Sequence, residues 1–470
     1  MKTNTKIIAT LGPSCFSQDI IENMISQGAN IFRLNMSHGN KKSKNQLYDV
    51  IEKIQLEDGN RPTILTDLCG PKIRIKSNID QKIISKDDKI IISSNKNEEN
   101  AVLVTEGVSF SNINTDSEIL INDGKVKLEV IEKLSDHKLE CRVIIGGKIE
   151  SGKGVNFPNS TLNLPSMTPK DIEDLELALE KGADWIALSF VRSHKDIEAV
   201  KKIMEEKNIH LPIIAKIEKW EALEDIDNII EKFDGVMVAR GDLGVEMPPE
   251  EVPIIQKRIV QSCRDYGKPV VVATQMLDSM INSPSPTRAE ASDVATAVFD
   301  AADSLMLSAE TASGKFPVES VQIMDRIIRG VEYDSSYRQI LESKKIKLEE
   351  TTSDAISSAA SQVVKTVLAK AIFTYTRSGA TAKRAARERP TVPIIGLSPD
   401  RITARQLALI WGVHTIHALE PKSFSGMIDN ACELAKKEGI VKKGDYVVVT
   451  AGAPIGVSGS TNNLRIAKIN

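Results

Sequence analysis

The sequence predicts an α/β protein: a closed (β/α)₈ TIM barrel with a small all-β domain inserted after its third strand and a further α/β domain at the carboxyl end. Three observations support this prediction. Eight short apolar runs occur along the first two thirds of the chain, helical patterns fill most of the intervals between them, and one interval is too long for a loop. An open, doubly wound parallel sheet is the alternative that the same runs allow.

Each predicted barrel strand is a short, continuous apolar run followed by polar or glycine-rich residues. Such runs are typical of parallel strands, which helices cover on both faces. Several runs follow a Gly or Ala signal that ends a helix, as in EKGAD and DYGKP. The runs span residues 6–12, 30–39, 63–70, 184–190, 212–219, 235–242, 269–276 and 304–311.

The inserted domain is predicted from the long interval between the third and fourth runs. Residues 75–165 alternate apolar and polar residues, as half-exposed strands do, and Asp123-Gly124 is a hairpin signal between two such runs. The expected segments are residues 1–70 (barrel, first part), 71–167 (inserted β domain) and 168–345 (barrel, second part).

The last part of the chain, residues 346–470, is predicted to form a third domain. A charged stretch at 336–354 follows the eighth run, and apolar runs then alternate with helical patterns again. Three of these runs are TVLAKAIFTYT, VPIIGLS and DYVVVTAG.

Composition narrows the expected partners to small molecules. The net charge is −3 and charged residues are spread along the chain, so no basic segment predicts binding to nucleic acid or to an anionic membrane. The apolar run at residues 7–11 is too short for a signal peptide or a membrane span, which predicts a cytoplasmic protein. The five cysteines show no CxxC spacing, so we expect reduced thiols.

Polar side chains gather where the predicted strands end, and barrels of this class place their active sites there. Lys216 and Glu218 share one face of a strand, and Asp242 ends the next strand. An isolated Lys-x-Glu is most often an incidental ion pair, but two carboxylates at neighbouring strand ends favour Mg²⁺ or Mn²⁺. Arg33 adds a planar guanidinium group, whose paired N–H donors suit the oxygens of phosphate or carboxylate. The other polar residues at strand ends are Asn35, Ser37, His38, Asp67, Arg240, Thr274, Gln275, Ser308 and Glu310.

Three segments allow two interpretations each. RGDLGVEMPPEEV is either an anion site at a helix start or a plain loop. In TDLCGPKIRIK, the alternating Lys72, Arg74 and Lys76 form either a solvated edge strand or an anion site. GKIESGKG (147–154) fits GxxxxGK but lacks the following Ser or Thr and the strand-to-helix context, so it is not a phosphate-binding P-loop. Lys153 within it is either a hairpin lysine or a phosphate contact.

Six motifs resemble the pyruvate kinase family in order and spacing, over essentially the whole chain. They are ATLGPS, FRLNMSHG, GPKIR, MVARGDLGVE, ATQMLDSMINSPSPTRAEASDVATAV and LSAETASGKFP. The resemblance implies transfer of the phosphoryl group of phosphoenolpyruvate to ADP, which gives pyruvate and ATP in the last step of glycolysis. It also implies the barrel, inserted lid and carboxyl-terminal domain expected above, in the compact form of bacterial members.

The resemblance assigns roles to individual residues. It implies that Glu218 and Asp242 hold Mg²⁺ or Mn²⁺, that Lys216 stabilises the transferring phosphoryl group and that Arg33 contacts phosphate. Gly241 would bind the substrate carboxylate through its backbone. Thr274 would lie near the carbon that is protonated and act through water. The implied nucleotide contacts are Asn35, Met36, Ser37, His38, Arg74 and Lys153, with Arg74 also counted as catalytic.

Lys72 separates this chain from the commoner form of the family. In that form a potassium ion lies on the equivalents of Asn35, Ser37, Asp67 and the carbonyl of Leu68, and a glutamate stands in place of Lys72. An ammonium group can take the place of a monovalent cation. The resemblance to members with this lysine therefore predicts that potassium is not required.

The carboxyl-terminal domain resembles the allosteric region of the family at residues 375–390 and 452–466. The hydroxyl-rich, glycine-bearing segment Thr376, Arg377, Ser378, Gly379, Ala380 and Thr381 is either a phosphate nest or a surface turn that starts a helix. We expect a phosphorylated-sugar or nucleotide effector there. The resemblance also implies a homotetramer.

Two other functions fit part of this pattern. Another metal-dependent barrel enzyme acting on pyruvate or phosphoenolpyruvate, an aldolase or a mutase, would share the Lys-x-Glu and Asp constellation but would need neither the lid nor Arg74 and Lys153. A catalytically silent, effector-binding regulator is disfavoured because each inferred catalytic position is filled.

Overall fold

Eight parallel strands close into a barrel, which confirms the predicted fold and rules out the open sheet. The computed structural model describes residues 3–56, 58–76, 82–98, 100–344, 346, 349–419, 421, 423–454 and 461–470. The order around the barrel is β1, β16, β15, β14, β13, β12, β3 and β2. Their bounds are β1 Lys6–Leu11, β2 Ala29–Asn35, β3 Thr63–Asp67, β12 Trp185–Leu188, β13 Ile213–Ile217, β14 Gly235–Ala239, β15 Val270–Ala273 and β16 Ser304–Leu307.

Helices surround the barrel and cover the outward side chains of its strands. Helix α3 shows how the sequence sets the start of such a helix. The Thr168 hydroxyl accepts a hydrogen bond from Asp171 N, and the Asp171 carboxylate accepts one from Thr168 N. Pro169 follows at the first helical position, where proline is favoured. The longer helices are α1 Gln18–Ser26, α2 Lys41–Lys53, α3 Pro169–Glu180, α4 Ile197–Glu206, α8 Val252–Asp265, α9 Arg288–Phe299, α11 Pro317–Glu332 and α12 Ser335–Ser343. The shorter ones are α5 Glu221–Glu224, α6 Ile226–Lys232, α7 Arg240–Glu246 and α10 Ala309–Ala312.

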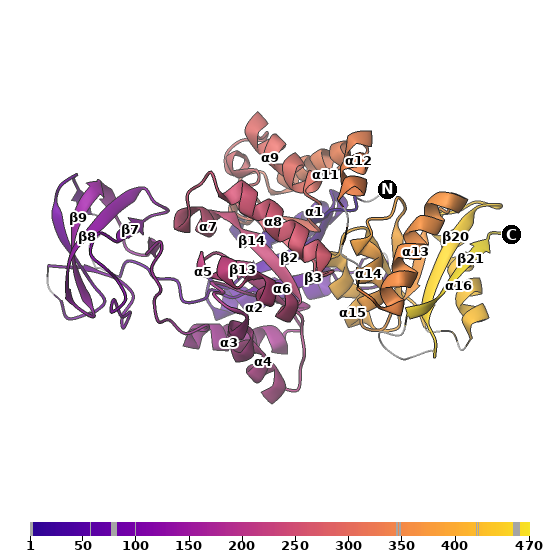
Figure 1. Ribbon diagram of the computed structural model, residues 1–470, viewed down its shortest axis with the longest axis horizontal. Helices are drawn as coiled ribbons and strands as arrows, with labels where there is room; N and C mark the ends of the chain where they lie inside the picture. The colour runs from indigo at the N-terminus through magenta and orange to yellow at the C-terminus, as the bar shows by residue number, and fades with distance from the viewer. Residues whose placement is uncertain are drawn as a thin grey trace.

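The segment between β3 and α3 forms a separate all-β lobe at one end of the molecule, as predicted (Figure 1). It has its own core, built around residues such as Ile92, Phe110 and Leu128. Asn122, Asp123 and Gly124 all have positive φ angles and form the turn between β7 and β8. The strands are β4 Lys82–Ile84, β5 Lys89–Ser93, β6 Val102–Leu103, β7 Glu118–Ile121, β8 Val126–Ser135, β9 Lys138–Ile145, β10 Gly147–Ile149 and β11 Val155–Asn156.

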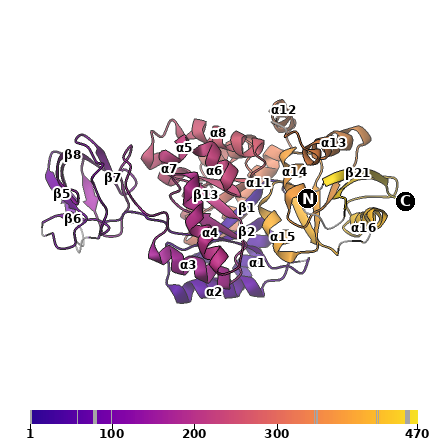
Figure 2. The same ribbon diagram turned by 60° about the horizontal axis from the view of Figure 1, so that its bottom comes forward.

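The carboxyl-terminal α/β unit lies at the other end, so the barrel is the middle of three lobes in both views (Figures 1 and 2). Its strands lie in the order β19, β18, β17, β20, β21, with β21 antiparallel at the edge. Its elements are α13 Thr352–Val367, β17 Ile372–Tyr375, α14 Ala380–Arg387, β18 Ile394–Ser398, α15 Arg401–Gln406, β19 Val413–His417, α16 Phe424–Lys437, β20 Tyr446–Gly452 and β21 Thr461–Lys468. Among the described residues, no helix is both long enough and apolar enough to cross a membrane.

The interior of the barrel is filled by apolar side chains rather than open. Inward residues such as Ile31, Leu65, Ile214 and Met237 form one buried cluster, and Ala386 of α14 belongs to the same cluster. The amino-terminal ends of the barrel strands are therefore closed by the carboxyl-terminal domain. The carboxyl ends of the strands stay available for a site.

Candidate active site

A layer of polar side chains lies directly above the apolar filling of the barrel, at the carboxyl ends of the strands. Residues two apart on a strand point to the same face. Each polar residue of this layer stands two positions after an interior apolar residue. The pairs are Ile8 and Thr10, Ile31 and Arg33, Leu65 and Asp67, Ala187 and Ser189, and Ile214 and Lys216. Along each of these strands, the inward side chains therefore change from apolar in the core to polar at the carboxyl end within two residues.

Asp67 holds the two predicted phosphate-binding cations together. Arg33 Nε donates to Asp67 Oδ2 at 2.7 Å, and Lys216 Nζ lies 3.1 Å from Asp67 Oδ1. All three side chains are buried. Burial alone would raise the pKa of Asp67, but Lys216 and Arg33 outweigh it and lower that pKa below its usual value. Asp67 therefore stays ionised between its two partners.

Lys216 is held as an ammonium by carboxylates on two sides. Its Nζ lies 2.9 Å from Glu218 Oε1 and donates to Ser189 Oγ at 2.6 Å. Burial works to lower the pKa of Lys216, but Asp67 and Glu218 outweigh burial and raise that pKa. A fixed, desolvated positive charge at this position can stabilise negative charge that moves during a reaction.

Glu218 and Asp242 supply the two carboxylates predicted to bind a divalent cation. Glu218 is buried, and its Oε2 accepts a hydrogen bond from Phe190 N at 2.8 Å. Burial raises the pKa of Glu218. The positive charge of Lys216 opposes this increase, and the negative charge of Asp242 adds to it, so Glu218 and Asp242 interact electrostatically. Phe190 has a φ of 56°, a strained value for an aromatic residue and one that recurs at functional sites.

The donor set at this point suits Mg²⁺. Among the residues that the structure describes, no group of three or more histidine, cysteine, aspartate or glutamate side chains is arranged to hold a metal. Mg²⁺ is commonly bound by only one or two carboxylates, with water and substrate oxygens completing its shell. The pair Glu218 and Asp242 fits that requirement.

Lys72 lies in the wall of this site and is paired with Asp242. Its Nζ makes an ion pair with Asp242 Oδ1 at 2.6 Å, and among the described residues it makes none with Asp67. The physical reason is that Arg33 and Lys216 already neutralise Asp67. The ammonium is therefore found on the predicted metal ligand rather than on the carboxylate of the predicted potassium site.

Gly241 and Thr274 are brought together from neighbouring strand ends. Gly241 N donates to Thr274 Oγ1 at 2.7 Å. A Cβ at position 241 would lie 3.3 Å from that hydroxyl, so glycine permits this close approach. Thr274 itself has a φ of 70°, which is strained for a β-branched residue. The Pro-bearing helix start predicted after these glycines is that of α8, which begins at Val252 with Pro253 in its first turn, whereas Gly241 and Gly244 lie within the short helix α7 directly after β14.

The predicted nucleotide loop after β2 is tied to β3. Met36 N donates to the Asp67 carbonyl at 2.9 Å, and Asn35 Oδ1 accepts from Ser37 N at 3.0 Å. Partial burial lowers the pKa of His38, and Arg74, Arg33, Lys72 and Lys170 lower it further. Cations from β2, from the segment after β3 and from α3 therefore act on this loop.

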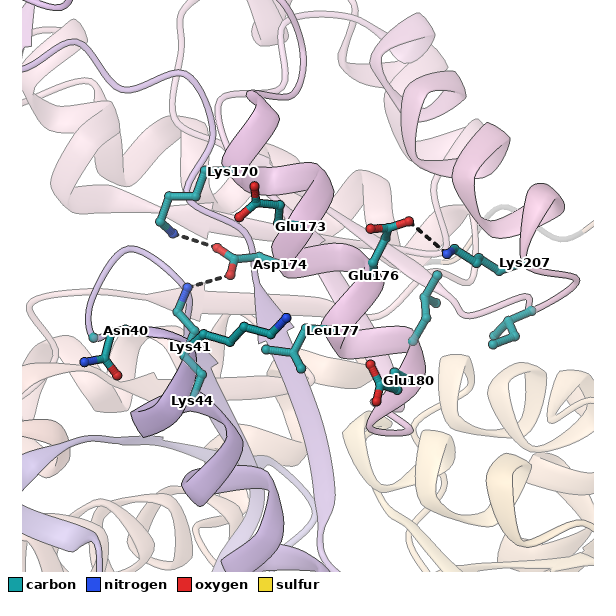
Figure 3. Close-up of a pocket in the computed structure, with 13 residues that line it drawn as sticks. Asn40, Lys41, Lys44, Lys170, Glu173, Asp174, Glu176, Leu177, Glu180 and Lys207 are labelled. Carbon is teal, nitrogen blue, oxygen red and sulfur yellow. Dashed lines mark hydrogen bonds and ion pairs between the residues drawn. The ribbon is translucent and has the colours of Figure 1, made fainter.

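Lys170 is a site residue that the sequence did not indicate. Its Nζ donates to the Met36 carbonyl at 2.6 Å and to Asp174 at 2.6 Å, while the buried Lys44 donates to the other oxygen of Asp174 (Figure 3). The local signal was only an i,i+4 Lys-Asp pair in α3, which is common on helix surfaces. Ser189 was missed as well, although it stands in the polar position two residues after Ala187.

Arg74 and Lys153 lie at the base of the inserted lobe. Arg74 Nη1 donates to the Gly152 carbonyl at 3.0 Å, and Lys153 Nζ is 3.9 Å from Glu150. Lys153 lies between the strands β10 and β11, so a strand and not a helix comes directly after it, and the P-loop interpretation is excluded as predicted. Lys76 is exposed at the end of the same segment.

The predicted effector segment, residues 376–381, connects β17 to α14. Gly379 precedes the helix with a φ of 81°, and Thr381 Oγ1 lies 2.6 Å from Thr461 Oγ1. The Arg377 carbonyl accepts a hydrogen bond from Thr403 Oγ1. Residues 455–460 of the second predicted allosteric stretch lie outside the described residues.

Comparison with known proteins agrees with this geometry. A model described as the pyruvate kinase barrel domain matches residues 2–321, and one described as the pyruvate kinase alpha/beta domain matches residues 354–467. A pyruvate kinase of Methylorubrum extorquens is 44% identical over 98% of this chain and 97% of its own length. One from Geobacillus stearothermophilus is 40% identical over 100% of this chain and 81% of its own length.

A solved structure supports the same assignment. The crystal structure of a pyruvate kinase from Cryptosporidium parvum matches with a TM-score of 0.92 and 33% identity, over 100% of this chain and 96% of that one. The sequence and structural matches both run through the barrel and the carboxyl-terminal domain. They leave no support for a separate aldolase, mutase or non-enzymatic class. The chain therefore belongs to the pyruvate kinase family of phosphotransferases.

Proposed function

We propose that the site at the carboxyl end of the barrel transfers the phosphoryl group of phosphoenolpyruvate to ADP, giving pyruvate and ATP. The observation that carries this proposal is the buried, mutually neutralised cluster of Arg33, Asp67, Lys216 and Glu218 beside Asp242. Phosphoryl transfer depends mainly on positioning and on neutralising charge, and this cluster holds its cations in fixed places before substrate arrives.

Lys216 and Arg33 are the phosphoryl-binding cations in this scheme. Asp67 pairs with both, so their positive charges are held together above the barrel floor. Lys216 stabilises the charge on the phosphoryl group as it moves from the enol oxygen to ADP. Arg33 orients the phosphate of phosphoenolpyruvate, and its planar guanidinium group keeps that phosphate aligned for transfer.

Family membership implies dependence on a divalent cation, and we propose that Glu218 and Asp242 hold it. The hard carboxylate oxygens favour Mg²⁺, with Mn²⁺ as a substitute. Such an ion would neutralise negative charge on substrate oxygens. Asp242 must then release Lys72, and we propose that the freed ammonium supplies the positive charge that potassium provides in other members.

Gly241 and Thr274 complete the substrate site. The Gly241 N–H, which donates to Thr274 Oγ1 in the structure, would turn to the carboxylate of phosphoenolpyruvate together with the neighbouring backbone. Loss of the phosphoryl group leaves an enolate, which takes a proton on its terminal carbon to become pyruvate. We propose that the Thr274 hydroxyl orients the water that delivers this proton.

ADP is proposed to bind between the loop after β2 and the inserted lobe. Asn35, Met36, Ser37 and His38 face its phosphates, and Arg74 and Lys153 reach them when the lobe closes as a lid. We add Lys170, which is already in contact with this loop. A cavity of about 560 Å³ adjoins it between α2 and α3 (Figure 3), a size that accommodates a nucleoside.

Regulation, assembly and location follow from the family and are also proposals. The turn at residues 376–381 is proposed to bind the phosphate of a sugar or nucleotide effector, because it leads into the amino terminus of α14. The working form is proposed to be a homotetramer in the cytoplasm. The domain limits proposed for it are residues 1–70, 71–167, 168–345 and 346–470.

A coupled assay tests the proposed reaction directly. The purified chain, given phosphoenolpyruvate, ADP and Mg²⁺, should produce pyruvate and ATP in equal amounts. No product with ADP present, or pyruvate formed without ATP, would contradict the proposal. The second result would point to a phosphatase or to one of the other barrel chemistries.

A further inference from the structure

Basic side chains line a small cavity at the end of the barrel opposite the active site, where the carboxyl-terminal domain packs. Its charged lining residues are Arg264, Lys268, Asp303, Lys383, Arg387 and Arg389. They come from the end of α8, the starts of β15 and β16, and α14 with the residues after it. The space is about 20 Å³, enough for one monatomic ion or one water molecule.

Three of these arginines have buried donors without a partner. Arg264, Arg387 and Arg389 are 6%, 4% and 2% exposed. Each keeps a buried nitrogen that makes no hydrogen bond: Arg264 Nη1, Arg387 Nε and Arg389 Nε. Leaving a buried cationic donor unsatisfied is costly, so such groups normally have a counter-charge or a bound ion.

The acidic residue in the lining cannot supply that counter-charge. Asp303 Oδ1 accepts hydrogen bonds from Arg389 Nη1 at 3.0 Å and from Trp411 N, and its Oδ2 accepts one from Val270 N at 3.0 Å. Both oxygens are therefore in use. Asp354 and Glu388 pair with Arg387 Nη2 and are not among the residues that line the cavity.

The lysines of the lining are not neutralised either. Within the part of the chain that the structure describes, Lys383 makes no ion pair; its Nζ lies 5.6 Å from the centre of the Trp185 ring. Lys268 Nζ donates to the carbonyls of Glu231 and Phe233 instead of to a carboxylate. Burial and, to a smaller extent, the charge of Arg389 together lower the pKa of Arg264 to about 10, although Glu388 opposes this shift.

We propose that this cavity binds a small monovalent inorganic anion of the size of chloride. The unpartnered guanidinium donors would hold it, since charge-assisted N–H donors around a cavity are the usual basis of anion binding. An anion here would join α8 and the barrel strands to α14. It would thereby stabilise the junction between the barrel and the carboxyl-terminal domain.

Bromide locates the site directly. Crystals of the full chain soaked in sodium bromide should give an anomalous peak in the cavity, within hydrogen-bond distance of at least two of the three arginines. Bromide replaces chloride in such sites and scatters anomalously. Electron density for water only, with no anomalous signal, would overturn the proposal.

Thermal unfolding measures what the anion does. At equal ionic strength, the midpoint in sodium chloride should exceed that in sodium gluconate, whose anion is too large for the cavity. For a dissociation constant of about 20 mM, roughly 0.2 M chloride favours the folded state about elevenfold and raises the midpoint of a chain of this length by about 1.5 °C.

Lys383→Met keeps the length of the side chain and removes one cation from the lining. The chloride-dependent shift and the bromide peak should both be lost in this variant. Lys437→Met, at the exposed end of α16, makes the same change away from the cavity and should keep both. An equal chloride response in the wild type and in Lys383→Met would contradict the proposed site.

Discussion

At the scale of single residues, the active site is a set of buried charges that neutralise one another. Asp67 lies between Arg33 and Lys216, and Lys216 lies between Asp67 and Glu218. An ionised group in a protein interior must be paired or it loses its charge. The pairs therefore explain how Lys216 can remain a cation in a buried position.

Ser189 is predicted to be a positioning residue for Lys216. Its Oγ accepts from Lys216 Nζ and donates to the Leu68 carbonyl at 2.7 Å, so it fixes the direction of the ammonium. Ser189→Ala should lower kcat by up to about tenfold, the value of one hydrogen bond, and change KM for phosphoenolpyruvate much less. Steady-state kinetics measure both constants.

Ser343→Ala is the matched control, because Ser343 is exposed at the end of α12. It should leave both constants unchanged. A Ser189→Ala enzyme with unchanged kcat, or one affected only in KM, would show that Ser189 does not orient Lys216.

Lys72 is predicted to make the enzyme independent of potassium. The wild type should keep most of its rate in potassium-free buffer. Lys72→Glu removes the tethered cation and should lose about tenfold or more of the rate there, with recovery when potassium is added. Initial rates across a potassium titration measure the effect.

Lys76→Glu reverses a charge four residues further on, at an exposed position, and should remain independent of potassium. A wild type that loses most of its rate when potassium is withdrawn would contradict the assignment of Lys72.

At the scale of elements, α3 and the loop after β2 meet although many residues separate them in sequence. Lys170 of α3 contacts the Met36 carbonyl, and the shared Asp174 ties it to Lys44 of α2. This contact fixes the loop that is proposed to bind the nucleotide phosphates.

The charge of Lys170 should be detectable at His38. Partial burial, Arg74 and other cations including Lys170 lower the pKa of His38, so its imidazole should titrate below pH 6.5. The folded chain then binds fewer protons there than the unfolded chain. This group consequently makes the free energy of unfolding decrease as the pH falls below about 6.5.

Lys170→Met should raise the titration midpoint of His38 and increase KM for ADP. An NMR pH titration of the His38 ring and steady-state kinetics provide the two readouts. Lys195→Met, at an exposed position, is the control and should alter neither. An unchanged midpoint in Lys170→Met would mean that Lys170 does not act on this loop.

The sequence predicted elements better than it predicted contacts. All eight barrel strands were found because each is a continuous apolar run, and Lys216, Glu218, Arg33 and Asp67 were found because they end such runs. Lys170 and Ser189 were not, since Lys170 lies on a helix far from this loop in the sequence, and Ser189 is an uncharged residue inside the predicted run 184–190. The pairing of Lys72 with Asp242 could not be predicted, because it depends on how the inserted lobe meets the barrel.

At the scale of the whole molecule, the two outer lobes join the barrel in different ways. The carboxyl-terminal domain continues the apolar core of the barrel interior. The inserted lobe is held by polar contacts, including Lys72 with Asp242, Asn156 with Glu246, and Arg192 with the Leu162 carbonyl. Polar contacts of this kind can break and re-form, as a lid requires, whereas an apolar junction favours a fixed arrangement.

The central claim is that a fixed positive charge at Lys216 drives phosphoryl transfer in a fold that does not depend on it. The most direct measurement is the kcat of Lys216→Met in the coupled assay, with circular dichroism to confirm the fold. The variant should fold normally and lose on the order of 10²-fold or more in kcat, the cost of removing one electrostatic stabiliser. A folded Lys216→Met enzyme with near-normal kcat would contradict the account.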